Sequence, residues 1–119
     1  MRYMLLIYGP DQQPSSDAAA MPDMKPWFDY GDWLTERGWF QAGEPLAPTS
    51  SATTVRIKDG QRLVTDGPFT ETREVLGGYY IVECTDLDAA IEAAARCPGA
   101  LYGSMEIRPI LGMSLEASA

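Results

Sequence analysis

Strongly apolar segments alternate with amphipathic segments along this sequence. Residues 2–8 form an almost continuous apolar run, which is typical of a strand buried on both faces. A second run of this kind spans 79–84 and follows a pair of glycines. Shorter segments at 39–43 and 103–110 complete four predicted core strands, the last with clean alternation of apolar and polar residues.

Two segments carry the spacing of an amphipathic helix. The first starts at Pro26, which suits an early helical position, and ends before Gly38, which suits the position after a helix. The second spans 85–96, with Thr85 as its predicted N-cap and a Pro-Gly pair after its end. The positions predicted to face the core are Trp27, Tyr30, Gly31 and Leu34 in the first helix and Leu87, Ala90, Ile91 and Ala94 in the second.

The strongest turn signal is Asp59-Gly60, which lies between β-rich runs at 53–58 and 61–65. An Asp-Gly pair in this setting predicts a tight hairpin with a type I′ turn. The mixed Arg, Lys and Gln content of the two runs indicates that one hairpin face meets solvent. Residues 70–74 are compatible with one helical turn, and so are residues 16–20 within the Pro-rich loop over 9–26.

Without the hairpin, the predicted order of elements is β-α-β-β-α-β, the pattern of a ferredoxin-like α+β fold. The 119 residues suit a single domain, which we place at 1–111, with a loose tail at 112–119. Two helices cover only one face of a four-stranded sheet, yet two strands are apolar on both faces. We therefore expect a homodimer, sheet against sheet; the alternative is that the loop at 9–26 folds over part of the sheet.

Composition and charge narrow the classes of function. The net charge of −8 disfavours nucleic-acid and anionic-membrane partners, which bind basic surfaces. The sequence has no histidine, which excludes imidazole bases, Ser-His and Cys-His nucleophile pairs and His-ligated zinc. No segment has the length of a membrane span or the pattern of a signal peptide, so we expect a cytoplasmic protein. Cys84 and Cys97 are then expected to be buried free thiols, with a redox pair as the alternative.

Asp66, in the sequence Asp66-Gly67-Pro68-Phe69, is the first candidate for acid–base chemistry, because a carboxyl group held in a turn beside an aromatic ring can be desolvated. The alternative is that Asp66 only caps the turn by accepting its own downstream N–H groups. A small-molecule site lined by aromatic and carboxylate side chains is expected nearby. Its candidate residues are Tyr8, Trp33, Glu44, Phe69, Glu71 and Glu74.

Asp66, Glu44, Glu71 and Glu74 are enough carboxylates to hold Mg²⁺ or Ca²⁺ if they cluster at one end of the fold. The sequence lacks the acidic loop spacing typical of such sites, so we expect no metal and no cofactor. Glu71 and Glu74 have the alternative interpretation of a solvated surface.

Several motifs, in order along nearly the whole chain, resemble the DGPF subfamily of YCII-related domain proteins. They are residues 1–8, 53–56, 64–69, 71–74, 76–80 and 105–109, with Asp66–Phe69 and the following Gly77-Gly78-Tyr79-Tyr80 the most specific. The resemblance implies a dimeric α/β barrel of ferredoxin-like subunits. It also implies that some relatives are encoded beside extracytoplasmic-function sigma factors, and that a His-Asp pair serves wider relatives, one branch of which eliminates chloride from a muconate-type substrate. That pair cannot be carried over to a chain without histidine.

Three functions remain open at this point. The first is binding of a small organic molecule near Asp66, with lyase- or isomerase-like acid–base chemistry. The second is a non-catalytic sensing or accessory module linked to sigma-factor-dependent transcription. The third is a purely structural dimer. The sequence does not decide whether the protein is an enzyme.

Overall fold

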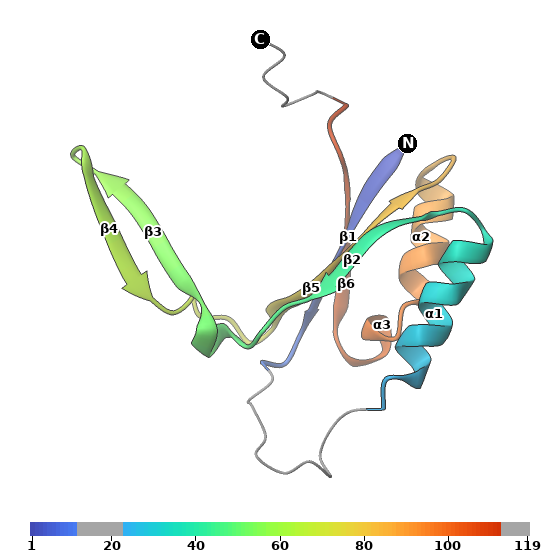
Figure 1. Ribbon diagram of the computed structural model, residues 1–119, viewed down its shortest axis with the longest axis horizontal. Helices are drawn as coiled ribbons and strands as arrows, with labels where there is room; N and C mark the ends of the chain where they lie inside the picture. The colour runs from blue at the N-terminus through green and yellow to red at the C-terminus, as the bar shows by residue number, and fades with distance from the viewer. Residues whose placement is uncertain (12–22, 113–119) are drawn as a thin grey trace.

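The computed structural model describes residues 1–11 and 23–112 and contains two separate sheets (Figure 1). The larger sheet has four strands in the order β2-β5-β1-β6, and every neighbouring pair is antiparallel. Its strands are β1 (Arg2–Gly9), β2 (Phe40–Pro45), β5 (Val75–Glu83) and β6 (Ser104–Pro109). The order is consistent with the predicted ferredoxin-like α+β fold, and the sheet does not close into a barrel.

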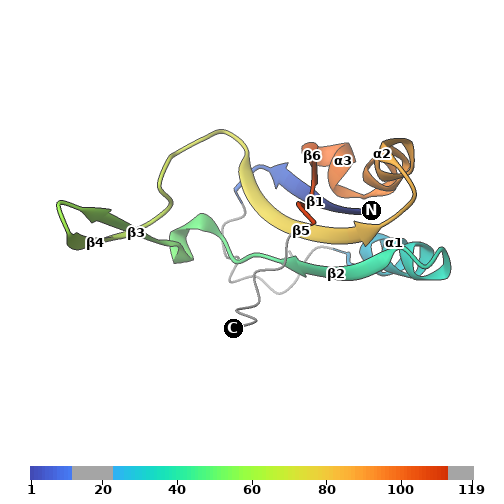
Figure 2. The same cartoon turned by 90° about the horizontal axis from the view of Figure 1, so that it is seen from above.

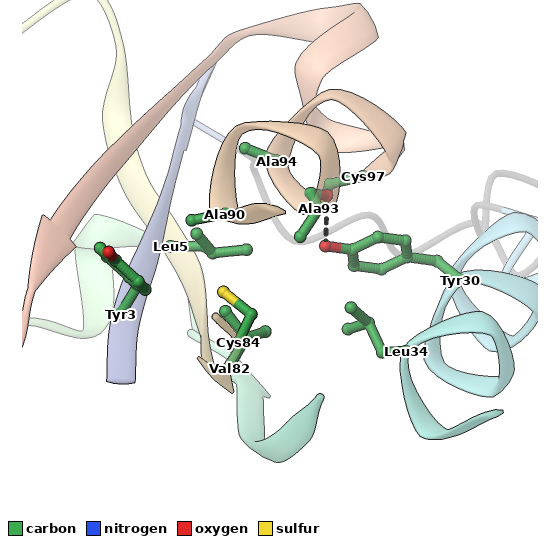
Figure 3. Packing of buried hydrophobic residues seen from close by; sticks show 10 residues of the cluster. All are labelled: Tyr3, Leu5, Tyr30, Leu34, Val82, Cys84, Ala90, Ala93, Ala94 and Cys97. Carbon is green, nitrogen blue, oxygen red and sulfur yellow. Dashed lines mark hydrogen bonds between the residues drawn. The ribbon is translucent and has the colours of Figure 1, made fainter. Parts of the chain in front are cut away.

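Three helices lie on one side of this sheet (Figures 1 and 2). They are α1 (Lys25–Glu36), α2 (Leu87–Arg96) and the short α3 (Gly99–Tyr102). The core between helices and sheet contains Tyr3, Leu5, Tyr30, Leu34, Val82, Cys84, Ala90, Ala93, Ala94 and Cys97, drawn in Figure 3. The Tyr30 hydroxyl donates a 2.7 Å hydrogen bond to the Ala93 carbonyl, so the buried hydroxyl is satisfied and α1 is joined to α2.

The predicted core stripe of α1 is confirmed at Tyr30 and Leu34, which are buried, and at Trp27, which packs against the core. It is wrong at Gly31, where a Cβ would meet nothing within 4 Å. The prediction for α2 is wrong in two details. Asp86, not Thr85, is the N-cap, and its carboxylate accepts a 2.9 Å hydrogen bond from the Ala89 N–H. The buried face contains Ala90, Ala93 and Ala94, while Leu87 and Ile91 are about half exposed, because small residues allow α2 to approach the sheet closely.

Three further details of the chain differ from the predictions. Residues 70–74 form bends rather than a helical turn. β5 begins at Val75 and runs through Gly77-Gly78 instead of starting after them. α3 follows immediately where Pro98-Gly99 was expected only to end a helix. The predicted helical turn at 16–20 and the predicted tail beyond Gly112 lie outside the described residues, so the domain limit at residue 111 stays a prediction.

The predicted hairpin forms the second sheet, β3 (Thr53–Lys58) with β4 (Gln61–Asp66), and we call residues 53–66 the arm. Asp59 and Gly60 have φ values of 52° and 74°, as a type I′ turn requires. The expectation of one solvent-facing side is wrong, because every arm residue except Thr54 is exposed. Figure 2 shows the arm extending far from the larger sheet. The radius of gyration is accordingly 16.8 Å, against about 13.5 Å for a compact chain of this length.

The face of the larger sheet that turns away from the helices is not covered by any described residue. Antiparallel partners share a face, and residues alternate between faces along each strand. We call this surface the open face; it consists of Arg2, Met4, Leu6, Tyr8, Ala42, Glu44, Leu76, Tyr79, Ile81, Glu83, Ser104, Glu106 and Arg108. The apolar residues in its middle are only half buried. The alternation of β6 is thereby confirmed, since Met105 and Ile107 pack against the core.

Both cysteines are buried free thiols, as predicted. Burial raises the pKa of the Cys97 thiol to about 11 and raises that of Cys84 as well. Among the helices of the described residues, none is long and apolar enough to cross a bilayer.

Candidate functional site

The Asp66–Phe69 segment turns the chain sharply where the arm returns to the larger sheet. Gly67 adopts φ +100°, a conformation that disfavours any residue with a side chain. Its N–H donates to the Ala52 carbonyl at 2.7 Å, and its carbonyl accepts a 2.8 Å hydrogen bond from the Thr54 hydroxyl. These two bonds hold the turn against the start of β3. Within the described residues, the Asp66 carboxylate accepts no backbone N–H, so the turn is fixed through Gly67 and not by an Asp66 cap.

A depression of about 340 Å³ opens beside this turn. Its lining comes from the residue after β1, from the short 3₁₀ helix at Thr49–Ser51 (η2) and from the segment that joins β4 to β5. Asp11 connects the first two parts, because its carboxylate accepts hydrogen bonds from both the N–H and the hydroxyl of Thr49. The lining residues are Asp11, Thr49, Ser50, Gly67, Pro68, Thr70, Glu71, Thr72 and Val75.

The polar side chains of the lining are hydroxyls and carboxylates. Four hydroxyl groups, those of Thr49, Ser50, Thr70 and Thr72, both donate and accept hydrogen bonds, whereas the carboxylates of Asp11 and Glu71 only accept. None of the nine lining residues carries a positive charge. Such a surface favours a ligand rich in hydroxyl or amine donors and disfavours a phosphate or carboxylate group.

Among the predicted site residues, only Glu71 lies in this lining. Asp66 and Phe69 belong to the turn but are exposed outside the lining, and Phe69 is 74% exposed. Glu74 is exposed in the same segment, and its carbonyl accepts a hydrogen bond from the Thr72 hydroxyl. The turn therefore contributes its backbone to the depression, and not the side chain of Asp66.

Tyr8 and Glu44 lie on the open face, on β1 and β2 respectively. The Tyr8 hydroxyl donates a 3.2 Å hydrogen bond to Glu106 Oε1 on β6. Partial burial raises the pKa of Tyr8, and the hydrogen bond and the negative charge of Glu106 act in the same direction. Tyr8 is thus a neutral hydroxyl donor at neutral pH.

Trp33 belongs to the helical side of the molecule. The guanidinium groups of Arg37 and Arg96 both lie over its indole, at 4.5 Å and 4.9 Å from the ring centroid. It also meets Trp39 edge to face, with centroids 5.7 Å apart. Contacts of this kind attach the end of α1 to the end of α2. Trp33 therefore lies away from the other predicted site residues.

The carboxylate cluster considered for Mg²⁺ or Ca²⁺ does not form. Within residues 1–11 and 23–112, no three cysteine or carboxylate side chains come together in an arrangement that could hold a metal ion. Asp66, Glu44, Glu71 and Glu74 are instead distributed over the arm, the edge strand β2 and the segment before β5.

Sequence reasoning missed Asp11, Thr49, Ser50, Thr70 and Thr72. The only local signal was the run of hydroxyl residues at 49–51, just before the hairpin. Its meaning depends on Asp11, which is 38 positions away in the sequence and reaches Thr49 only in the fold.

Comparison with known proteins identifies the family of this chain. The family model of the YCII-related domain matches residues 1–114. The chain belongs to the YCII-related family. An uncharacterised protein of Rhizobium meliloti (strain 1021) is 34% identical to this YCII-related chain over 117 residues, and the match covers 92% of each chain. The predicted membership of the YCII-related family is therefore confirmed, and the DGPF subfamily stays a prediction.

Proposed function

We propose that this YCII-related protein is a homodimer that binds a small polar organic molecule in the depression beside the Asp66–Phe69 turn. The depression carries the proposal, because hydroxyl and carboxylate groups from three segments converge on one space of about 340 Å³. That volume suits a small metabolite. The acidic, hydroxyl-lined surface favours a polyol, an amino sugar or an amine.

The open face supports the homodimer. Its centre is apolar, with Met4 and Leu6 on β1 and Ile81 on β5, and its borders carry charges such as Glu106 and Arg108. An apolar sheet face of this kind is normally covered in a soluble protein. A second copy, related by a two-fold axis, brings an identical face against it, as in the dimeric barrel that the family resemblance implies.

A thermal-shift screen with polyols, amino sugars and amines tests ligand binding. A compound that binds the folded protein raises its melting temperature. At a concentration one hundred times its Kd, it adds about 2.7 kcal/mol to the free energy of unfolding. Glu71→Gln should reduce the shift, since the amide lacks the charge that attracts an amine. The matched control is Glu74→Gln, which changes the same charge in the same segment outside the lining. Equal shifts in all three proteins, or none with any compound class, would contradict the proposal.

Acid–base chemistry is proposed for Asp66 on the part of a bound molecule that projects out of the depression, because the exposed Asp66 carboxylate lies outside the lining but directly precedes the lining residue Gly67. Asp66→Asn keeps the shape and the hydrogen-bond acceptor but removes the ionisable group. If Asp66 transfers a proton, turnover of a compound found in the screen should fall by about 10² to 10⁴, with the melting temperature retained. Unchanged turnover in the variant would remove Asp66 from the chemistry and leave binding as the function.

A further inference from the structure

The arm is a two-stranded sheet without a core of its own. Its four aliphatic side chains are exposed: Val55 to 57%, Ile57 to 70%, Leu63 to 44% and Val64 to 59%. An isolated hairpin is marginally stable in water, because two strands bury too little apolar surface. A regular arm of this length therefore points to a surface that covers it.

The aliphatic residues are unequally divided between the two sides of the arm. Cross-strand partners share a side, so Val55, Val64 and Ile57 lie on one side, next to Arg62. The opposite side contains Leu63 with Arg56 and the pair formed by Lys58 and Gln61. The arm is thus amphipathic, and we call the side with Val55, Ile57 and Val64 its apolar side.

The arm also differs in charge from the rest of the chain. It contains three of the nine basic residues and two of the seventeen acidic residues, which leaves six basic and fifteen acidic residues elsewhere. A slightly basic arm is therefore attracted to the strongly acidic body of a second copy.

The position of the arm favours the same occupant. In both views the arm lies on the far side of the larger sheet from helices α1, α2 and α3 (Figures 1 and 2). A second copy seated on the open face lies on this side of the sheet too.

We propose that the arm is a dimerisation arm whose apolar side, formed by Val55, Ile57 and Val64, lies against the body of a second copy. This inference rests on the proposed homodimer and adds a second contact to the open face. In a two-fold dimer each subunit extends one arm to the other, so the contact is made twice.

The test is the dimer dissociation constant of Val55→Thr/Val64→Thr, measured by sedimentation velocity. Threonine has the shape and strand propensity of valine, so the change adds polarity without altering the arm. Four valines are replaced in each dimer, and we expect the Kd to rise by about 10²-fold or more. The matched control, Leu63→Thr, changes the neighbouring residue on the opposite side and should leave the Kd within about threefold.

Leu6→Asp separates this inference from the homodimer itself, because it places a charge at the centre of the open face. If Leu6→Asp dissociates the dimer and the valine variant does not, the arm proposal is wrong and the homodimer stands. An equal loss of affinity in Leu63→Thr would also overturn it, because the contact would not be specific to the apolar side. A wild-type protein that is monomeric at micromolar concentration contradicts the arm and the homodimer together.

Discussion

The side chain that starts helix α2 illustrates how a single residue sets an element. Asp86 has extended backbone geometry, and its carboxylate satisfies the Ala89 N–H, one of the unpaired donors at a helix start. Replacing Asp86 with Ala should lower the free energy of unfolding by about 1 kcal/mol. Urea denaturation measures this loss. Thr85→Ala is the control and should have little effect; equal losses in both variants would contradict the assignment of the cap.

Buried groups that resist ionisation determine the stability at alkaline pH. Burial raises the pKa of Cys97 from 9.0 to about 11 and that of Tyr80 from 10.0 to about 12. Because the unfolded chain releases these protons first, these two groups should leave the free energy of unfolding unchanged up to about pH 9 and lower it between pH 9 and 12. Urea unfolding across this range tests the direction. Cys97→Ala should show a smaller fall, and an identical pH profile in both proteins would be inconsistent with a buried thiol.

At the scale of elements, the entry into β6 depends on a close approach of two backbones. A Cβ on Gly103 would lie 1.9 Å from the Tyr8 carbonyl oxygen, which a backbone atom cannot easily avoid. We expect Gly103→Ala to cost about 3 kcal/mol, measured by thermal and urea unfolding. Gly31→Ala in α1 is the opposite case, because the added Cβ meets nothing within 4 Å. Since alanine favours the helix over glycine, this variant should raise the free energy of unfolding by up to about 1 kcal/mol. A neutral Gly103 variant would mean that the strand entry is adjustable.

The sequence predicts those elements whose geometry depends on residues that are close together along the chain. The type I′ turn at Asp59-Gly60 and the core stripe of α1 are of this kind. The start of β5 is not of this kind. Gly78 lies within the strand at a point where β2 approaches closely, since a Cβ there would come 3.1 Å from the Glu44 carbonyl oxygen. This need for glycine is set by strand pairing and not by the adjacent residues. The depression depends even more on the fold, since Asp11 meets Thr49 only after β1 and η2 have been positioned.

At the scale of the whole molecule, the proposed ligand site and the proposed arm share their supporting segments. All lining residues except Asp11 and Val75 belong to the two segments that connect the arm to the larger sheet. If a second copy holds the arm, it also orders this lining, and coupling between sites is reciprocal. A compound found by the thermal-shift screen should therefore lower the dimer Kd in sedimentation velocity. Its effect should be absent in Glu71→Gln; a ligand that binds without changing the Kd would show that site and arm are independent.

The homodimer is the claim on which the rest of the account depends, and the molar mass in solution tests it most directly. Size-exclusion chromatography with light scattering at micromolar concentration should give about 26 kDa, twice the chain mass of 13.0 kDa. Leu6→Asp, which charges the centre of the open face, should shift the mass towards that of a single chain. A wild-type protein that elutes as a single 13.0 kDa species at these concentrations would contradict the account.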